Sequence, residues 1–169
     1  MRPSENRKKD RIKMNITVLA VGTKMPRWVD EAVNEYAKRF GRDVDYVLKE
    51  IKPEKRGAGV NAAQGMAAEE KRILDALPAG ALVVALDERG KAPTSVELAA
   101  YLQSWRQNGE HVCFLIGGAD GMTDALKSRA ALLLRLSSLT LPHGMVRVLL
   151  TEQLYRAVSI LNNHPYHRE

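Results

Sequence analysis

Apolar and polar positions alternate in blocks along the chain, and each block has the length and period of a strand or a helix. Short apolar or alternating runs predict strands over residues 16–21, 44–51, 81–86, 111–116 and 132–136. Longer segments with one apolar face predict helices over about residues 27–40, 62–77, 95–107, 124–131 and 145–161. Strands that alternate with helices are typical of an α/β domain. We therefore expect a single domain with a mostly parallel sheet and helices on both faces.

Size and composition support one ordinary globular domain. The chain has 169 residues, of which 45% are apolar and 27% charged, and this balance excludes a disordered or fibrous protein. Its single cysteine, Cys113, excludes an intramolecular disulfide and a multi-cysteine metal site, which fits a cytoplasmic protein. No apolar run approaches the roughly 20 residues that span a bilayer, so we expect no membrane partner.

Most of the positive charge lies in the first thirteen residues. The formal net charge is +6, but residues 1–13 contribute +4, and the remaining chain carries 20 basic against 18 acidic side chains. We expect residues 1–13 to be a basic flexible tail and residues 14–169 to be the folded domain. The tail could be without function, attract RNA non-specifically, or reflect a start at Met14. It lacks the apolar segment of a secretory signal.

Three loops at the carboxyl ends of the predicted strands are candidates for a ligand site, because open α/β sheets bind ligands there. They span residues 87–91, 117–121 and 137–144. Gly117-Gly118 would allow close approach of a ligand, although two glycines after a strand also form simple turns. Residues 136–142 are both apolar and hydroxyl-bearing, which suits a flat aromatic ligand such as adenine. Alternatively, this run leads from a strand into a helix, with Pro142 near its first turn.

Two common nucleotide motifs are absent from the sequence. Without G-x-G-x-x-G after the first strand, we do not expect a dinucleotide or a conventional Rossmann methyl-donor site. Without G-x-x-x-x-G-K-[ST], ATP hydrolysis is not supported.

The C-terminal segment concentrates residues that can transfer protons and bind anions. His164, Tyr166, His167 and Arg168 lie within the last six residues. A zinc site is not expected, because His-x-x-His lacks a third ligand and Pro165 prevents a regular helix. The alternative is a frayed polar tail, the usual state of terminal residues.

Taken together, these segments resemble the RlmH family of the SPOUT superfamily. The resemblance covers residues 14–169, and it rests on six blocks, which are residues 18–26, 86–91, 114–118, 139–148, 152–157 and 163–169. Residues 1–13 have no counterpart in the family.

The resemblance implies an α/β fold with a C-terminal trefoil knot, a homodimer, and S-adenosylmethionine as cofactor. It implies methylation of N3 of a pseudouridine in 23S ribosomal RNA, which we expect on the assembled ribosome because the folded body carries little net charge. The residues expected to bind the cofactor are Leu86, Gly117, Gly118, Leu136, Ser137, Ser138, Leu139, Thr140 and Leu141. The C-terminal segment would complete the site across the dimer interface.

The remaining assignments follow from the chemistry of the reaction that the resemblance implies. The N3–H of pseudouridine is weakly acidic, so His164 or His167 would remove its proton, directly or through Tyr166. Arg147, Arg156 or Arg168 would stabilise the charge that develops on the flanking carbonyl oxygens, and Arg156 is the one assigned to catalysis. The residues expected to contact RNA are Arg147, Arg168, Lys24 and Arg27.

Two other functions are compatible with the same sequence. One is a SPOUT-type methyltransferase that acts on another RNA, such as a transfer RNA. The other is a non-enzymatic, ribosome-associated RNA-binding factor, in which the histidines, tyrosine and arginine of the C-terminal segment would only contact RNA.

Overall fold

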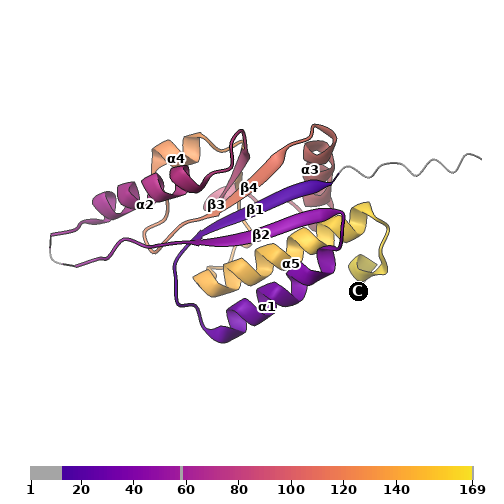
Figure 1. Ribbon diagram of the computed structural model, residues 1–169, viewed down its shortest axis with the longest axis horizontal. Coiled ribbons are helices and arrows are strands. Elements are labelled where there is room, and N and C mark those ends of the chain that lie inside the picture. Colours follow the sequence, from indigo (N-terminus) through magenta and orange to yellow (C-terminus); the bar gives the residue numbers. More distant parts are fainter. Residues whose placement is uncertain (1–12, 58, 169) are drawn as a thin grey trace, which may run out of the picture.

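The computed structural model describes residues 13–57 and 59–168, with the backbone alone of Arg168. They form a five-stranded sheet in the order β2-β1-β4-β3-β5, in which neighbouring strands run parallel. Helices pack on both faces of this sheet (Figure 1). The predicted α/β class is confirmed.

All ten predicted elements are present. The strands are β1 (Met14–Val21), β2 (Val44–Ile51), β3 (Leu82–Lys91), β4 (His111–Ile116) and β5 (Leu132–Leu134). The helices are α1 (Arg27–Ala37), α2 (Ala62–Ala76), α3 (Ser95–Gln107), α4 (Asp124–Ser128) and α5 (His143–Leu161). Two 3-10 turns, η1 (Lys38–Phe40) and η2 (Pro165–Arg168), follow α1 and α5. The main differences in length are that β3 extends five residues further, α4 and β5 end earlier, and α5 begins two residues earlier than predicted.

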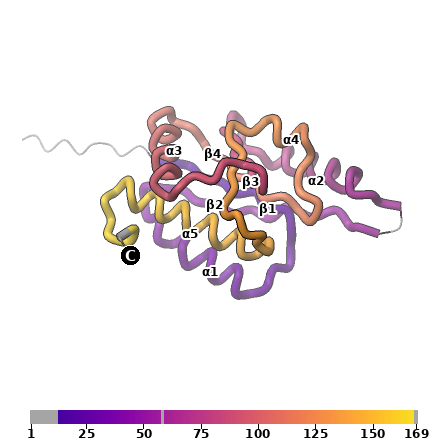
Figure 2. The backbone as a smooth tube through the Cα atoms, turned by 180° about the vertical axis from the view of Figure 1, so that it is seen from behind, coloured from indigo at the N-terminus to yellow at the C-terminus, as the bar shows by residue number. Residues whose placement is uncertain are grey.

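The core has two apolar layers, one on each face of the sheet. Alternate residues of β1 enter different layers, since successive side chains of a strand point to opposite faces. Ile16 and Val18 pack with apolar residues of α3 and α5, whereas Leu19 and Val21 pack with residues of α2 and α4. Helices α1 and α5 lie side by side in both views (Figures 1 and 2). Helix α5 also packs against α3, on the face of the sheet that Ile16 and Val18 enter.

The end of β3 differs from the prediction that the strand stops at Leu86 and is followed by a turn over residues 87–91. Instead, β3 continues to Lys91. Leu86 and Lys91 both pair with Leu134 of β5, so residues 87–90 leave the regular register between the two pairings. The pairing of Lys91 with a strand more than forty residues away gives no local signal in the sequence, and this explains the wrong boundary.

The irregular segment of β3 is held by local contacts. The Asp87 carboxylate accepts a hydrogen bond from the backbone N–H of Arg89 at 2.7 Å and forms an ion pair with Lys127 at 2.7 Å. Gly90 lies against β5 so closely that a Cβ atom there would be 2.6 Å from the carbonyl oxygen of Leu133. A residue with a side chain would therefore push the two strands apart.

Residues 1–12, which contain most of the predicted basic tail, lie outside the described part of the chain. Lys13 forms an ion pair with Asp45 of β2 at 2.9 Å. Within residues 13–57 and 59–168, no helix is both long and apolar enough to cross a membrane. In the same residues, no cluster of three or more His, Cys, Asp or Glu side chains could hold a metal ion.

Candidate functional site

A cavity of about 1120 Å³ opens where the carboxyl ends of β1, β3 and β4 meet. Its wall comes from the loop after β1, the irregular end of β3, the glycine-rich turn after β4 and the segment between β5 and α5. The nine residues expected to bind the cofactor all line it, namely Leu86, Gly117, Gly118, Leu136, Ser137, Ser138, Leu139, Thr140 and Leu141. Segments far apart in the sequence thus meet at the edge of the sheet where a ligand was expected.

The glycines after β4 are required by close packing. The carbonyl oxygen of Gly118 accepts a hydrogen bond from the N–H of Gly121 at 3.0 Å, which closes a tight turn. A Cβ atom on Gly117 would lie 3.0 Å from the backbone of Gly121, and one on Gly118 would lie 3.0 Å from the side chain of Val21. The absence of side chains lets the backbone of this turn form the cavity wall directly.

The opposite wall, residues 136–141, has no regular secondary structure. The Ser137 hydroxyl accepts a hydrogen bond from the Leu139 N–H at 2.9 Å, and the Leu139 side chain is 77% exposed at the cavity. Pro142 then precedes the first residue of α5. The segment leads into a helix, as the alternative interpretation predicted, and it also lines the cavity, while its binding of an aromatic ligand stays a prediction. Irregular backbone leaves N–H and C=O groups that a ligand can bind.

Arg147 lies under the cavity and is only 1% exposed. Its guanidinium donates to the Glu50 carboxylate at 2.7 Å, to the Gly22 carbonyl at 3.0 Å and to Nε2 of His143 at 2.9 Å. These bonds tie the ends of β1 and β2 to the first turn of α5. The prediction that Arg147 contacts RNA is inconsistent with this position, because a buried guanidinium with three protein partners presents no surface to RNA.

His143 lines the cavity and was not among the predicted site residues. Burial lowers the pKa of its ring, and the neighbouring Arg147 guanidinium lowers it further. A hydrogen bond with the backbone of Gly117 and the charge of Glu50 raise the pKa, but the lowering effects are larger. The ring is therefore neutral at neutral pH, with Nε2 as an acceptor. The four-residue spacing of His143 and Arg147, which places them on one helix face, is the signal that could have indicated this pair.

The predicted catalytic residues gather at the other end of α5, around a carboxylate that the sequence analysis missed. Glu152 is 9% exposed, and its Oε1 accepts hydrogen bonds from the Tyr166 hydroxyl at 2.9 Å and from Arg156 at 2.7 Å. The Arg156 guanidinium also lies 4.9 Å from the centre of the Tyr166 ring. Burial raises the pKa of Tyr166, and the bond to Glu152 raises it further, so Tyr166 stays protonated. The four-residue spacing of Glu152 and Arg156, which places them on one helix face, is the signal in the sequence that could have indicated their ion pair.

The two terminal histidines lie next to this cluster. Nδ1 of His164 accepts the backbone N–H of Tyr166 at 3.2 Å, and its ring is on an exposed residue. Nδ1 of His167 lies 3.4 Å from the Ser159 hydroxyl. The side chain of Arg168 lies outside the described part of the structure. The segment is thus folded back on α5 by specific contacts, and the alternative of a frayed tail does not hold for residues 162–167.

The cavity and the terminal cluster lie at opposite ends of the same helix. Helix α5 has 19 residues, which corresponds to about 28 Å at 1.5 Å per residue. His143 at its first turn lines the cavity, whereas the chain end, marked C in Figure 1, follows its last turn. None of the predicted catalytic residues His164, Tyr166, His167 and Arg156 is among the described residues that line the cavity.

The two other predicted RNA contacts are surface residues beside the cavity. Lys24 is exposed between Thr23 and Met25, which both line the cavity, and it adopts a positive φ of 56°. The side chain of Arg27, at the start of α1, is 92% exposed and pairs with Glu31 at 2.8 Å. Both side chains are accessible to a large ligand over the cavity mouth.

Comparison with known proteins gives one consistent family. Residues 14–167 match the family described as "Predicted SPOUT methyltransferase". A protein of Neisseria meningitidis serogroup A, named "Ribosomal RNA large subunit methyltransferase H", is 86% identical over 156 residues, which cover 92% of this chain and 100% of the relative. Proteins with the same name and coverage are 85% identical in Neisseria gonorrhoeae and 65% identical in Chromobacterium violaceum. The chain therefore belongs to the SPOUT methyltransferase family.

Proposed function

We propose that this protein is an S-adenosylmethionine-dependent methyltransferase that modifies N3 of a pseudouridine in 23S ribosomal RNA on the assembled ribosome. Its family and the printed names of its relatives support this function. The observation that carries the proposal is that all nine residues expected to bind the donor line one cavity at the carboxyl edge of the sheet.

The cavity has the shape and chemistry that the donor requires. Its volume of about 1120 Å³ accommodates a nucleoside with an amino-acid side arm. Leu86, Leu136 and Leu141 would pack on the adenine, and the irregular backbone around Ser138 would bind its polar edge. When bound, S-adenosylmethionine supplies a methyl group on a positively charged sulfur, whose transfer a site with little water favours.

The terminal cluster has the groups needed to prepare the pseudouridine. N3 becomes a good nucleophile only when it loses its proton. His164 is the better base, since its ring is accessible while His167 faces Ser159. Tyr166 stays protonated and would donate a hydrogen bond rather than accept the proton. Arg156, oriented by Glu152, would stabilise the negative charge on the flanking carbonyl oxygens.

The separation of the two half-sites favours a homodimer. A second chain related by a twofold axis, with its α5 antiparallel to the first, would bring its terminal cluster to the cavity. Each dimer would then contain two composite sites. The family resemblance supports the same arrangement.

We also propose the C-terminal trefoil knot that the family resemblance implies. It is supported by β5, because Leu134 pairs with Leu86 before the irregular segment and with Lys91 after it. Residues 87–90 would form one of the loops through which the chain passes.

The surface charge supports the assembled ribosome as substrate rather than free RNA. Outside residues 1–13 the net charge is small, and the basic side chains of Arg147 and Arg56 are engaged in ion pairs within the protein. Binding would therefore depend on shape and on several neighbouring ribosomal components. This substrate places the protein in the cytoplasm.

Deletion of the gene followed by mass spectrometry of ribosomal RNA tests the proposal. We expect one methylated pseudouridine of 23S RNA to lose its methyl group and to regain it when the gene is restored. Loss of a methyl group from transfer RNA instead would indicate the other SPOUT activity. Unchanged RNA, together with no thermal stabilisation of the protein by S-adenosylmethionine, would indicate a non-enzymatic ribosome-associated factor.

A further inference from the structure

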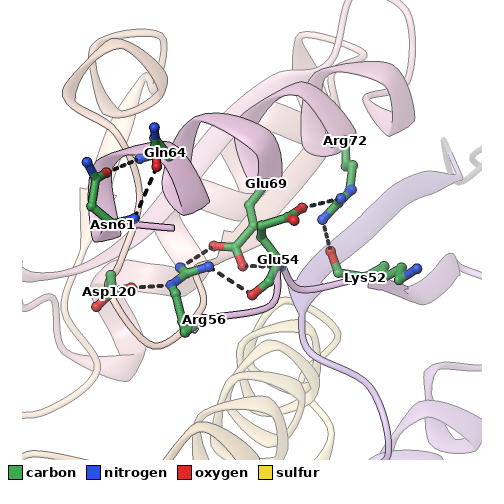
Figure 3. A network of polar contacts seen from close by, with 8 residues as sticks. All are labelled: Lys52, Glu54, Arg56, Asn61, Gln64, Glu69, Arg72 and Asp120. Atoms are coloured by element: carbon green, nitrogen blue, oxygen red, sulfur yellow. Dashed lines mark hydrogen bonds and ion pairs between the residues drawn. The ribbon is translucent and has the colours of Figure 1, made fainter. Parts of the chain in front are cut away.

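Arg56 connects three parts of the fold beside the cavity (Figure 3). Its Nε donates to the Asp120 carboxylate at 2.7 Å, Nη2 donates to Glu69 at 3.3 Å, and Nη1 donates to the backbone carbonyl of Glu54 at 2.9 Å. Asp120 belongs to the glycine-rich turn after β4, Glu69 to α2, and Glu54 to the loop between β2 and α2. One guanidinium thus uses its rigid fork of donors to hold these segments together.

The anchor of this network is buried. The Glu69 side chain is only 4% exposed, and its second oxygen accepts the backbone N–H of Glu54 at 2.9 Å. Arg72 holds the same loop by donating to the carboxylate of Glu54 and to the carbonyl of Lys52. The loop and α2 therefore form a fixed support from which Arg56 extends toward the turn.

The surrounding glycines fit this arrangement. A Cβ atom on Gly65 of α2 would lie 2.2 Å from Nη1 of Arg56, and one on Gly118 would lie 3.1 Å from Oε1 of Glu69. Gly65 leaves the space that the Arg56 side chain occupies, and Gly118 lets the turn approach the support. Asp120 lines the cavity, whereas Arg56 is absent from the described residues that line it.

From this geometry we propose that Arg56 is a positioning residue for the methyl donor, because through Asp120 it holds the turn of residues 118–121 in the conformation that binds the donor. The inference rests on the proposed function. Its expected consequence is a loss of donor affinity without a loss of the chemical step, since Arg56 does not line the cavity where the reaction would occur.

Donor binding to matched variants tests this role. We expect Arg56→Gln and Asp120→Ala each to raise the Kd for S-adenosylmethionine about fivefold, as the loss of a partly exposed ion pair would. The double variant should be no weaker than either single variant, because both remove the same contact. Arg56→Lys should recover part of the affinity. At saturating donor, kcat of Arg56→Gln for ribosome methylation should stay within about twofold of the unmodified protein.

Arg72→Gln is the control, because it removes a guanidinium from the same network without touching the turn. We expect it to leave the Kd unchanged. If Arg72→Gln weakens binding as much as Arg56→Gln, the network serves stability only and the proposal is wrong. If the effects of Arg56→Gln and Asp120→Ala multiply in the double variant, Asp120 acts on the donor independently of Arg56, which also contradicts the proposal.

Hydrogen exchange of the protein without donor gives a readout that does not depend on the proposed function. Amides of residues 117–122 should exchange faster in Arg56→Gln than in the unmodified protein or in Arg72→Gln. Unchanged exchange would overturn the positioning role even if Arg56→Gln weakened donor binding. An unmodified protein that does not bind S-adenosylmethionine would overturn the proposed function, while the exchange result would still decide whether Arg56 holds the turn.

Discussion

The first half and the second half of α5 each contain a buried charged side chain that forms an ion pair. The groups that surround these two side chains differ in their chemistry. At the first turn, the buried Arg147 pairs with Glu50, and its hydrogen bonds hold backbone segments around the cavity. In the second half, the buried Glu152 pairs with Arg156 and also holds Tyr166 of the C-terminal segment. One buried charge therefore organises a binding site made mainly of backbone, and the other organises a cluster of reactive side chains.

This difference explains why neither end forms an active site alone. The cavity wall includes glycine turns, leucines and the first residue of α5, His143, but none of the side chains predicted to be catalytic. The terminal cluster can move a proton but has no cavity of comparable size among the described residues. The proposed homodimer would bring a cavity and a terminal cluster together from two chains.

Heterodimers with differently tagged chains provide the most decisive test of this division. Gly118→Val should block the cavity, and Arg156→Ala should disable the terminal cluster, so each homodimer should lose more than about 100-fold in methyl transfer to ribosomes. A heterodimer with one change on each chain should retain about half of the unmodified activity, because one of its two composite sites is intact.

The control is a heterodimer with both changes on the same chain. If each cavity is completed by the partner, this heterodimer has no intact site and should be inactive. The opposite pattern, with activity only when both changes share a chain, would show that each chain completes its own site.

The buried charges themselves should differ in their contribution to stability. Arg147→Leu removes three hydrogen bonds and leaves Glu50 without its partner, although Glu50 is partly exposed. We expect the free energy of unfolding to fall by about 2–4 kcal/mol. Arg156→Leu removes a guanidinium that is 25% exposed, while Tyr166 and Gln153 still donate to the buried Glu152, so it should cost less, about 1–2 kcal/mol. Urea unfolding measures both values, and equal losses would contradict the distinction between the two ends.

The sequence predicted the fold better than it predicted the roles of charged residues. The spacing of apolar residues predicted every helix and strand, because this spacing is visible within the residues of each element. Arg147 was taken for a surface residue because its partner Glu50 is 97 positions away, and nothing near Arg147 in the sequence shows its burial. The resemblance implied that the C-terminal segment completes the site from a second chain, but the contacts of that segment with Glu152 and Ser159 depend on how it packs on α5.

The end of β3 allows a smaller test at the cavity side. Gly90→Ala would place a Cβ atom 2.6 Å from the backbone of Leu133, so we expect a loss of about 2 kcal/mol in the free energy of unfolding. Gly57→Ala is the matched control, since nothing lies within 4 Å of a Cβ atom at that position. It should change the stability by less than about 0.5 kcal/mol. Similar effects of the two substitutions would mean that β3 and β5 can separate at Gly90 without cost.

The smallest expected effect is a pH dependence that arises at the first turn of α5. Burial and the nearby Arg147 outweigh Glu50 and lower the pKa of His143 below its ordinary value of 6.5, so the unfolded chain binds a proton more readily than the folded protein. The free energy of unfolding should therefore decrease as the pH falls below about 6.5, by at most about 1.4 kcal/mol per pH unit for this group. Urea unfolding at several pH values measures this slope, which His143→Gln should reduce. His164→Gln, at the other end of the helix, should leave it in place, and a slope that persists in His143→Gln would mean that other groups cause it.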